Sequence, residues 1–317
     1  MSATELNTLQ RRIIGALQVD GRASWRRIAE VLGEPERTVT RHGSGLLKSG
    51  HVIVTAVPTP AQQLLVACES GLGTSRLVGE ALARRGDAAF VYATSGTSSV
   101  LAEVSHSNDL DDLLTVQLPA TPGLNRFTAY SVLKPFKRLR DWRCGALTPA
   151  EELALTNPAE AHRNDAVHSE YPSPADGPLI EALRKDGRIG TEELARRTRM
   201  STTSVIRRIR WLLKSGQLSI CTLVEPALLG FAEEAVLWVK APPEHLEELG
   251  HHLQRRPEVR HASAITGEYQ LFVNIAATSQ AHLYALLSHS MWSQKTLHIH
   301  TDTVVTARKR GGRLMPR

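Results

Sequence analysis

The residues of this chain with the clearest chemistry are the cations and hydroxyls between positions 194 and 224, a stretch that contains no acidic residue. Arg207, Arg208 and Arg210 lie off the apolar stripe of a predicted helix at 202–214, where they can contact phosphates or guanine edges. Hydroxyls crowd the start of that helix, at Ser201, Thr202, Thr203 and Ser204. The pattern predicts a DNA-binding helix, and the simpler alternative is a solvated basic face behind an N-cap.

A second copy of this stretch lies 166 residues earlier, with Ala16 matching Ala182. Thirteen of the 35 positions from 16 to 50 match their partners, which indicates a duplication. The first copy offers Arg37, Thr38 and Arg41 as DNA contacts. Two glycines inside its predicted helix weaken that helix. Two glutamates near the start of the helix repel phosphate. Two interpretations stay open: an asymmetric DNA reader, or a degenerate copy kept for packing.

Each repeat opens with the elements of a winged helix-turn-helix, namely three helices and a β-hairpin. The predicted helices of the first repeat span 5–18, 25–32 and 36–48. Those of the second repeat span 179–185, 192–198 and 202–214. Ser24 and Thr191 are predicted N-caps. A short β-rich run follows each set of helices, at 51–57 and 217–224.

The remainder of each repeat predicts a β-α-β-β-α-β order, which is typical of a ferredoxin-like sandwich. The fold class is therefore α+β, in two tandem units. We expect two helix-turn-helix domains at 1–60 and 178–226, and two sandwich domains at 61–145 and 227–307. A linker with one short helix is predicted at 146–177, and a mobile basic tail at 308–317.

This order of parts resembles the Lrp/AsnC family of bacterial transcription factors, in which a helix-turn-helix precedes an amino-acid-sensing domain. The family's loop motif T/S-G-x-x-D resembles the segments that begin at Thr266 and at Ser95. The resemblance implies an effector site at a subunit interface, formed by Thr266, Gly267, Glu268, Gln270, Ser95 and Gly96. The acid of the motif is replaced by Gln270 and Ser99, and Glu268 is the nearest charge. The resemblance also implies assembly through the sandwich domains, as a dimer or larger homo-oligomer.

Composition agrees with a DNA-binding protein. The net charge is +6 and the pI is about 9.4, which suits a polyanionic partner such as double-stranded DNA. The three cysteines are in no metal-ligand spacing, and no apolar run approaches the ~20 residues of a membrane span. We therefore expect a cytoplasmic, nucleoid-associated protein without a membrane partner.

We expect neither a cofactor nor a metal, because the histidines do not form a zinc pattern. We also expect no enzyme, because the chain lacks a phosphate loop and a catalytic-triad signature. The main alternative is a tetrapyrrole enzyme. Some two-unit relatives decarboxylate sirohaem with a Tyr-Arg-x-x-His-type constellation, which is missing from the matching segment, 261–269. A scaffold that binds no DNA is a third reading.

Overall fold

The structure is a computed structural model that describes residues 6–59, 62–106, 109–156 and 173–315. The chain divides into two compact units, one of residues 1–59 and 143–229 and the other of residues 60–142 and 230–317. Each unit therefore combines corresponding parts of both repeats. Among the described helices, none is long and apolar enough to cross a membrane.

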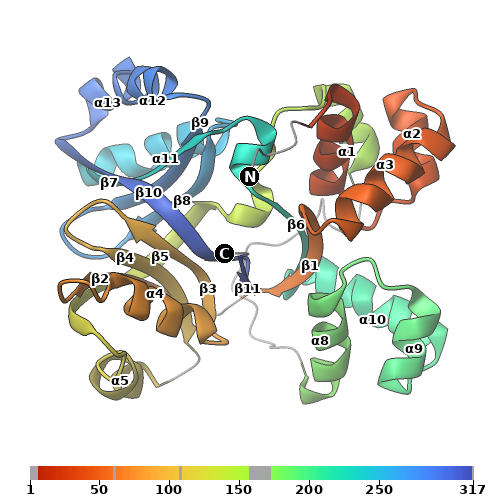
Figure 1. Cartoon of the computed structure of the whole chain (residues 1–317), viewed down its shortest axis with the longest axis horizontal. Coiled ribbons are helices and arrows are strands. Elements are labelled where there is room, and N and C mark those ends of the chain that lie inside the picture. Colours follow the sequence, from red (N-terminus) through yellow and green to blue (C-terminus); the bar gives the residue numbers. More distant parts are fainter. Residues whose placement is uncertain (1–5, 60–61, 107–108, 157–172, 316–317) are drawn as a thin grey trace. The chain divides into compact units, whose positions relative to one another are not determined.

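The first unit holds the two helix-turn-helix domains (Figure 1). The first reader comprises α1 (Thr8–Val19), α2 (Trp25–Leu32), α3 (Glu36–Lys48) and strand β1 (Val52–Pro58). The second reader comprises α8 (Gly177–Lys185), α9 (Thr191–Thr198), α10 (Thr202–Lys214) and strand β6 (Leu218–Val224). Helix α6 (Pro149–Leu155) belongs to the same unit, and residues 157–172 of the predicted linker lie outside the described residues.

Local sequence accounts for most of these helix boundaries. Ser24 and Ser201 each accept a hydrogen bond from a backbone N–H of the helix that follows. The prediction for Thr191 is wrong: it is the first residue of α9, and the N-cap is Gly190, which has no side chain to bond.

The expected hairpin within each reader is also wrong. Strand β1 pairs antiparallel with β6 of the other reader, from Val52 opposite Val224 to Pro58 opposite Leu218. Val54 and Ala56 of β1 pack into the core of the second reader. The two readers therefore share one ladder and part of one core.

Reciprocal hydrogen bonds join the Asp-Gly-Arg turns of the two readers. Arg22 donates to the carbonyls of Gly187 at 2.6 Å and Ile189 at 3.0 Å. Its counterpart Arg188 donates to the carbonyls of Gly21 at 2.7 Å and Ala23 at 2.8 Å. Each arginine thus satisfies buried carbonyl groups of the other reader, and the pairing has pseudo-twofold symmetry.

The second unit holds two sandwich domains with the same order of elements. The first sandwich domain consists of β2 (Gln62–Ser70), α4 (Ser75–Arg84), β3 (Ala88–Thr94), β4 (Val100–His106), α5 (Leu110–Asp112) with a π-helical turn (Leu113–Gln117), and β5 (Leu124–Lys137). The second consists of β7 (Glu233–Lys240), α11 (Leu246–Gln254), β8 (Val259–Ile265), β9 (Leu271–Ala277), α12 (Gln280–Leu287), α13 (Ser290–Lys295) and β10 (His298–Arg310).

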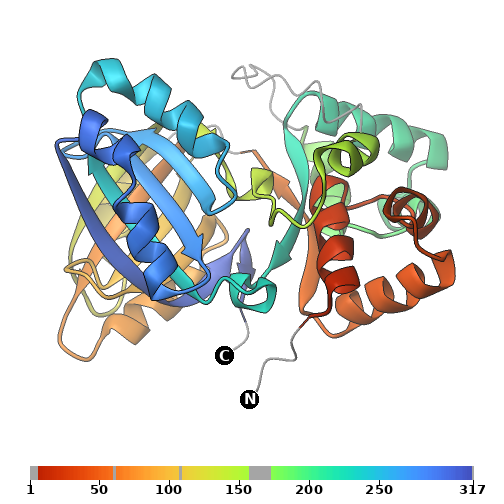
Figure 2. The same ribbon diagram turned by 90° about the horizontal axis from the view of Figure 1, so that it is seen from above.

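The two sheets join edge to edge into a closed barrel. The ladder runs β11-β10-β3-β4-β2-β5-β8-β9-β7, and β7 pairs again with β10. Helices α11 and α12 cover the outer face of the second domain's strands (Figure 2). Side chains from both domains fill the barrel interior, among them Phe90, Tyr92, Trp238 and Phe272. Each sheet therefore covers the apolar face of the other.

The basic segment at 308–310 is not a mobile tail. It completes β10, and β11 (Arg313–Leu314) folds back against it. Arg310 is 3% exposed and donates hydrogen bonds to both carboxylate oxygens of Glu234, at 3.0 and 2.6 Å. This ion pair anchors the end of β10 in the barrel.

Candidate DNA-reading helices and effector loops

Helix α10 presents one solvent-exposed face. Arg207, Arg210 and Lys214 are exposed on it, together with Thr202 and Thr203 at the start of the helix. Ser201 and Ser204 bond each other at 2.8 Å and cap the helix. The opposite face is buried and consists of Val205, Ile209, Leu212 and Leu213. The helix is thus held by its apolar face and offers a cationic one.

Arg208 does not belong to the exposed face. Its guanidinium donates two hydrogen bonds to Asp176, at 2.6 and 2.5 Å, and lies 4.0 Å above the Trp211 ring. The Asp176 side chain is only 6% exposed and the Arg208 side chain is 30% exposed, so the carboxylate of this charge-assisted pair is largely desolvated. The assignment of Arg208 as a DNA contact is therefore corrected: it ties α10 to the segment that precedes α8.

Helix α3 presents a matching face in the first reader. Arg37, Arg41 and Lys48 are exposed, and Thr38 is half-buried at the start of the helix. With Arg208 removed from the second face, the two helices each expose three basic residues. The difference in exposed basic residues that the sequence predicts is therefore absent from the structure, but exposed Glu36 still distinguishes the start of α3 from that of α10.

Gly43 of α3 has a packing role. A Cβ at this position would collide with the ring of Trp25, and the guanidinium of Arg188 lies 4.3 Å above that ring. The second reader has Thr191 and Ile209 at the two equivalent positions. The first reader thus pairs a large residue on α2 with a glycine on α3. The second reader pairs a smaller residue on α9 with an isoleucine on α10.

The two predicted effector loops dock on the barrel in the same way. Thr266 donates its backbone N–H to the Ser131 carbonyl at 3.0 Å, and its hydroxyl oxygen accepts from the Ser131 N–H at 2.9 Å. Ser95 makes the equivalent pair of bonds with Thr303, both at 3.0 Å. Both residues therefore join one sandwich domain to the last strand of the other, and their backbone amides are already used.

The two loop glycines leave space that side chains of the opposite sandwich domain occupy. Gly267 has φ 96°, and a Cβ there would lie 2.8 Å from the Tyr130 ring. A Cβ at Gly96 would collide with the carboxylate of Asp302. Gln270 accepts from the Ala241 N–H at 3.2 Å and donates to two loop carbonyls, so it holds the loop closed.

An aromatic cluster of Tyr130, Trp238 and Tyr269 surrounds the second loop. The ring centroids of Tyr130 and Tyr269 lie 5.2 and 5.9 Å from that of Trp238. Trp238 also donates to Asp302 at 3.3 Å, and Asp302 is 3.0 Å from His300. Burial raises the pKa of Tyr130, and the neighbouring Tyr269 and Glu268 raise it further. Sequence patterns do not reveal this cluster, because its members come from two separate strands, β5 and β7, and from the loop between β8 and β9.

Two buried polar groups lie deeper in the barrel. Glu234 is paired with Arg260 at 2.5 Å and with Arg310 at 2.6 Å. Burial opposes its ionisation, but the two arginines outweigh burial and hold the pKa of Glu234 at about 2. Glu103 lies 3.8 Å from His261, and burial raises the pKa of Glu103 to about 7 while it lowers the pKa of His261 to about 4.

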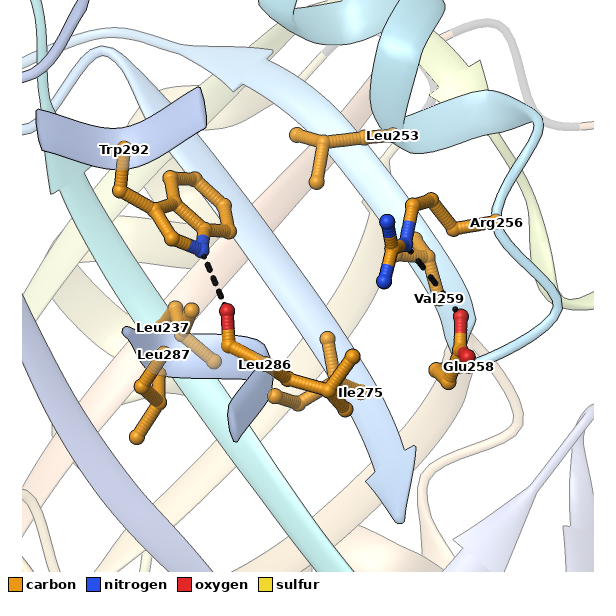
Figure 3. A pocket seen from close by; sticks show the side chains of 9 residues that line it. All are labelled: Leu237, Leu253, Arg256, Glu258, Val259, Ile275, Leu286, Leu287 and Trp292. Carbon is orange, nitrogen blue, oxygen red and sulfur yellow. Dashed lines mark hydrogen bonds and ion pairs between the residues drawn. The ribbon is translucent and has the colours of Figure 1, made fainter. Parts of the chain in front are cut away.

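A small cavity lies under the helices of the second sandwich domain. Trp292, Leu253, Leu237 and Ile275 line its apolar part, and Trp292 donates to the Leu286 carbonyl at 2.9 Å (Figure 3). Its volume is about 20 Å³. A cavity of this size holds about one water molecule and is too small for an amino acid.

Comparison with known proteins identifies these domains. The Lrp/AsnC ligand binding domain matches residues 234–314, and the AsnC-type helix-turn-helix domain matches residues 6–41 and 175–213. The chain is a tandem-duplicated member of the Lrp/AsnC family. It is therefore a transcriptional regulator of the Lrp/AsnC type, with DNA-binding helix-turn-helix domains and an effector-binding domain.

Single-unit regulators match less than half of this tandem Lrp/AsnC chain. The uncharacterized HTH-type transcriptional regulator PH0140 of Pyrococcus horikoshii is 23% identical over 138 residues, which cover 43% of this chain and 87% of the relative. FL11 of the same organism is 28% identical over 109 residues, covering 34% and 72%. LrpC of Bacillus subtilis is 26% identical over 135 residues, covering 42% and 94%.

The expectation that the chain is not an enzyme is contradicted by solved structures. The siroheme decarboxylase NirDL, an enzyme, covers 96% of this Lrp/AsnC chain and 93% of its own, with a TM-score of 0.65 and 12% identity. Its co-complex with an iron-uroporphyrin III analogue covers 90% of this chain and 86% of its own, with a TM-score of 0.62 and 12% identity. At this identity the likeness establishes a shared tandem fold.

Proposed function

We propose that this Lrp/AsnC-type regulator binds double-stranded DNA through α3 and α10, and that an amine-bearing metabolite such as an amino acid controls its binding. The exposed cationic faces of the two helices, joined in one unit, carry the DNA half of this proposal. Such helices position themselves by phosphate contacts and read sequence at base edges. The residues that we propose to contact DNA are Ser201, Thr202, Thr203, Ser204, Arg207, Arg210, Arg37, Thr38 and Arg41.

A salt titration with genomic DNA fragments tests the DNA half. Arg41→Ala and Arg207→Ala should each weaken binding and lower the slope of log affinity against log salt by about 1, because each removes one phosphate contact. Arg76→Ala is the matched control, since Arg76 is an exposed arginine on α4, outside the readers. Binding that is insensitive to both reader variants would contradict the proposal.

The effector half rests on the aromatic cluster beside Glu268. Glu268 is exposed, 3.6 Å from Lys240, and the rings of Tyr130 and Tyr269 are half-buried next to it. A carboxylate beside aromatic faces suits an ammonium group, through charge and cation–π attraction. We place the amine of the effector at Glu268, with Gly267 leaving room for the Tyr130 ring.

Amino acids and simple amines can be screened by thermal shift on the full chain. Glu268→Gln should abolish the shift produced by the best ligand, whereas Glu247→Gln, an exposed glutamate on α11, should leave it unchanged. Gly267→Val is less informative, because it combines strain at positive φ with a collision against Tyr130. If a bound amine also changes DNA occupancy, the coupling should be about 1–3 kcal/mol.

A tetrapyrrole-processing enzyme is the second candidate. The likeness to NirDL over nearly the whole chain favours it, and the buried Glu103 and His261 offer an acid and a base. Titration with iron-uroporphyrin while the absorbance band is followed provides the test. A shifted band would favour this candidate, and an unchanged spectrum would count against it.

We also propose that the protein is cytoplasmic and self-associates into a dimer or larger homo-oligomer. Each chain already pairs its own two readers and its own two sandwich domains, so a dimer would present four readers. Light scattering at micromolar concentration tests this, and a strictly monomeric full-length chain would contradict it.

A further inference from the structure

The recognition helices of the two readers share some exposed residues. At the offset of 166, Arg41 corresponds to Arg207 and Lys48 to Lys214, and all four are exposed. Identical cations at identical positions suit contacts with the phosphate backbone, which is the same at every sequence. Both readers therefore carry cations that can contact the phosphates of a DNA duplex.

The residues around these cations differ in chemistry. Arg37 at the start of α3 corresponds to Thr203, and half-buried Thr40 corresponds to Ile206, which is 43% exposed. The first helical turns of a recognition helix reach base edges. Arginine there pairs with guanine, whereas methyl groups of threonine and isoleucine suit the thymine methyl group.

The difference extends along both helices. Half-buried Ser44 corresponds to the exposed Arg210, and Gly45 of the first reader corresponds to Trp211. A Cβ at Gly45 would have nothing within 4 Å, whereas Trp211 carries the stacked guanidinium of Arg208. The first face thus has an extra arginine at its start, beside exposed Glu36, whereas the second face has its extra arginine farther along the helix.

The first reader has a filled core of its own. Trp25 occupies the space that Gly43 leaves, so the core is filled by a different pair of residues. Ile13, Ile28 and Val39 of this reader are fully buried. A packed core supports a recognition helix that can read bases.

The β1–β6 ladder and the reciprocal bonds of Arg22 and Arg188 hold the two readers in one unit. A homodimer of single-unit regulators offers two identical faces, and operator symmetry mirrors that identity. Here the paired faces are chemically different and covalently linked.

From these differences we infer that one chain reads a non-palindromic DNA site, in which the half-site under α3 differs from the half-site under α10. This inference rests on the proposed DNA binding. The half-site under α3 should contain a guanine opposite Arg37, and that under α10 should contain a thymine opposite Ile206 and a guanine opposite Arg210.

Selection from a random pool of duplexes with the full-length protein provides the test. The enriched motif should contain two unequal half-sites. A motif that is an inverted repeat, or that contains one half-site alone, would overturn the inference while the proposed DNA binding stands. If no duplex is enriched over the pool, the proposed DNA binding fails and the inference fails with it.

A face-exchange variant sharpens the experiment. Arg37→Thr with Thr40→Ile and Ser44→Arg gives α3 three of the residues that α10 exposes, those at 203, 206 and 210, without a change in net charge. This variant should prefer an inverted repeat of the α10 half-site over the wild-type motif by about 10-fold or more. Arg26→Thr, an exposed arginine on α2, should leave the wild-type preference unchanged. If the folded face-exchange variant keeps the wild-type preference, the inference is wrong.

Discussion

Arg199 has a left-handed backbone, with φ 57°, at the position where the first reader has Gly33 with φ 69°. It ends α9 in the turn between the two helices of the helix-turn-helix. A side chain in this conformation costs roughly 1–2 kcal/mol. We therefore expect Arg199→Gly to raise the free energy of unfolding by about 1 kcal/mol, measured by denaturant titration.

A helical neighbour of Arg199 gives the opposite expectation. Arg197 lies inside α9 and is exposed, so Arg197→Gly should lower the free energy of unfolding by about 1 kcal/mol. Equal destabilisation by the two variants would show that the positive φ of Arg199 carries no strain. The pair separates backbone conformation from the loss of an arginine.

Arg207 and Arg208 should respond differently to removal. Arg208→Ala leaves the largely buried Asp176 with the Ser173 N–H, at 2.9 Å, but without its two guanidinium bonds. We expect it to destabilise the protein by about 1–3 kcal/mol. Its salt slope for DNA should stay unchanged, whereas Arg207→Ala should lower the slope by about 1 with little loss of stability. A lower slope for Arg208→Ala would return that residue to the DNA contacts.

At the scale of elements, Trp25 and Gly43 should be energetically coupled. Trp25→Thr removes a half-buried ring that packs on Gly43, and Gly43→Ile forces a side chain into that ring. Each single change should cost on the order of 2–3 kcal/mol. The double variant reproduces the pair in the second reader, so its cost should be lower than the sum by at least about 1 kcal/mol. A double-mutant cycle by chemical denaturation measures this, and additive costs would contradict it.

The helices of the readers follow closely from local sequence. The bounds predicted for 25–32, 36–48 and 202–214 agree with α2, α3 and α10, because apolar spacing and N-cap residues act within a few positions. The predicted hairpins fail for the opposite reason. The partner of β1 is β6, more than 150 residues away along the chain, and strand partners at such distances have no local signature.

The same limit applies to the candidate sites. Thr202, Thr203, Arg207 and Arg210 could be placed on an exposed face from helical periodicity alone. The Asp176 partner of Arg208 lies outside its helix, so no periodicity reveals it. The loop glycines were identified by motif, but Tyr130 and Asp302, which they accommodate, come from the opposite sandwich domain.

At the scale of the whole molecule, duplication turns two open sheets into one barrel. Strand β5 pairs with β8 and β10 pairs with β3, so each domain supplies the edge that the other lacks. The family resemblance implied assembly through the sandwich domains. The edge pairing needed the three-dimensional arrangement, because it depends on how both sheets twist.

The closed barrel places Glu103 of the first sandwich domain against His261 of the second. One oxygen of Glu103 accepts from Gln63 at 2.5 Å, and the other has no hydrogen-bond partner among the described residues. Burial raises the pKa of Glu103 from 4.5 to about 7, although nearby Arg138 and Gln63 act in the opposite direction. Between pH 4.5 and about 7, the folded protein therefore keeps a proton on Glu103 that the unfolded chain has released.

The sign of the pH effect follows from this difference in bound protons. Between pH 4.5 and about 7 the folded protein binds more protons at Glu103 than the unfolded chain does, so this group lowers stability as the pH rises. The full shift corresponds to roughly 3 kcal/mol. His261 has the opposite effect, because burial lowers its pKa from 6.5 to about 4. The unfolded chain binds more protons at His261 between these values, so this group lowers stability as the pH falls below 6.5.

Glu103→Gln isolates the contribution of the carboxyl group. The amide oxygen can still accept from Gln63, and the side chain stays neutral at every pH. Compared with the wild type, the variant should be about equally stable near pH 4.5 and more stable by up to ~3 kcal/mol at pH 8, as measured by denaturant titration across that range. Glu244→Gln, at an exposed position before α11, should follow the wild-type curve. Parallel curves for Glu103→Gln and the wild type would mean that Glu103 is ionised in the folded barrel at neutral pH, with its charge stabilised by Arg138.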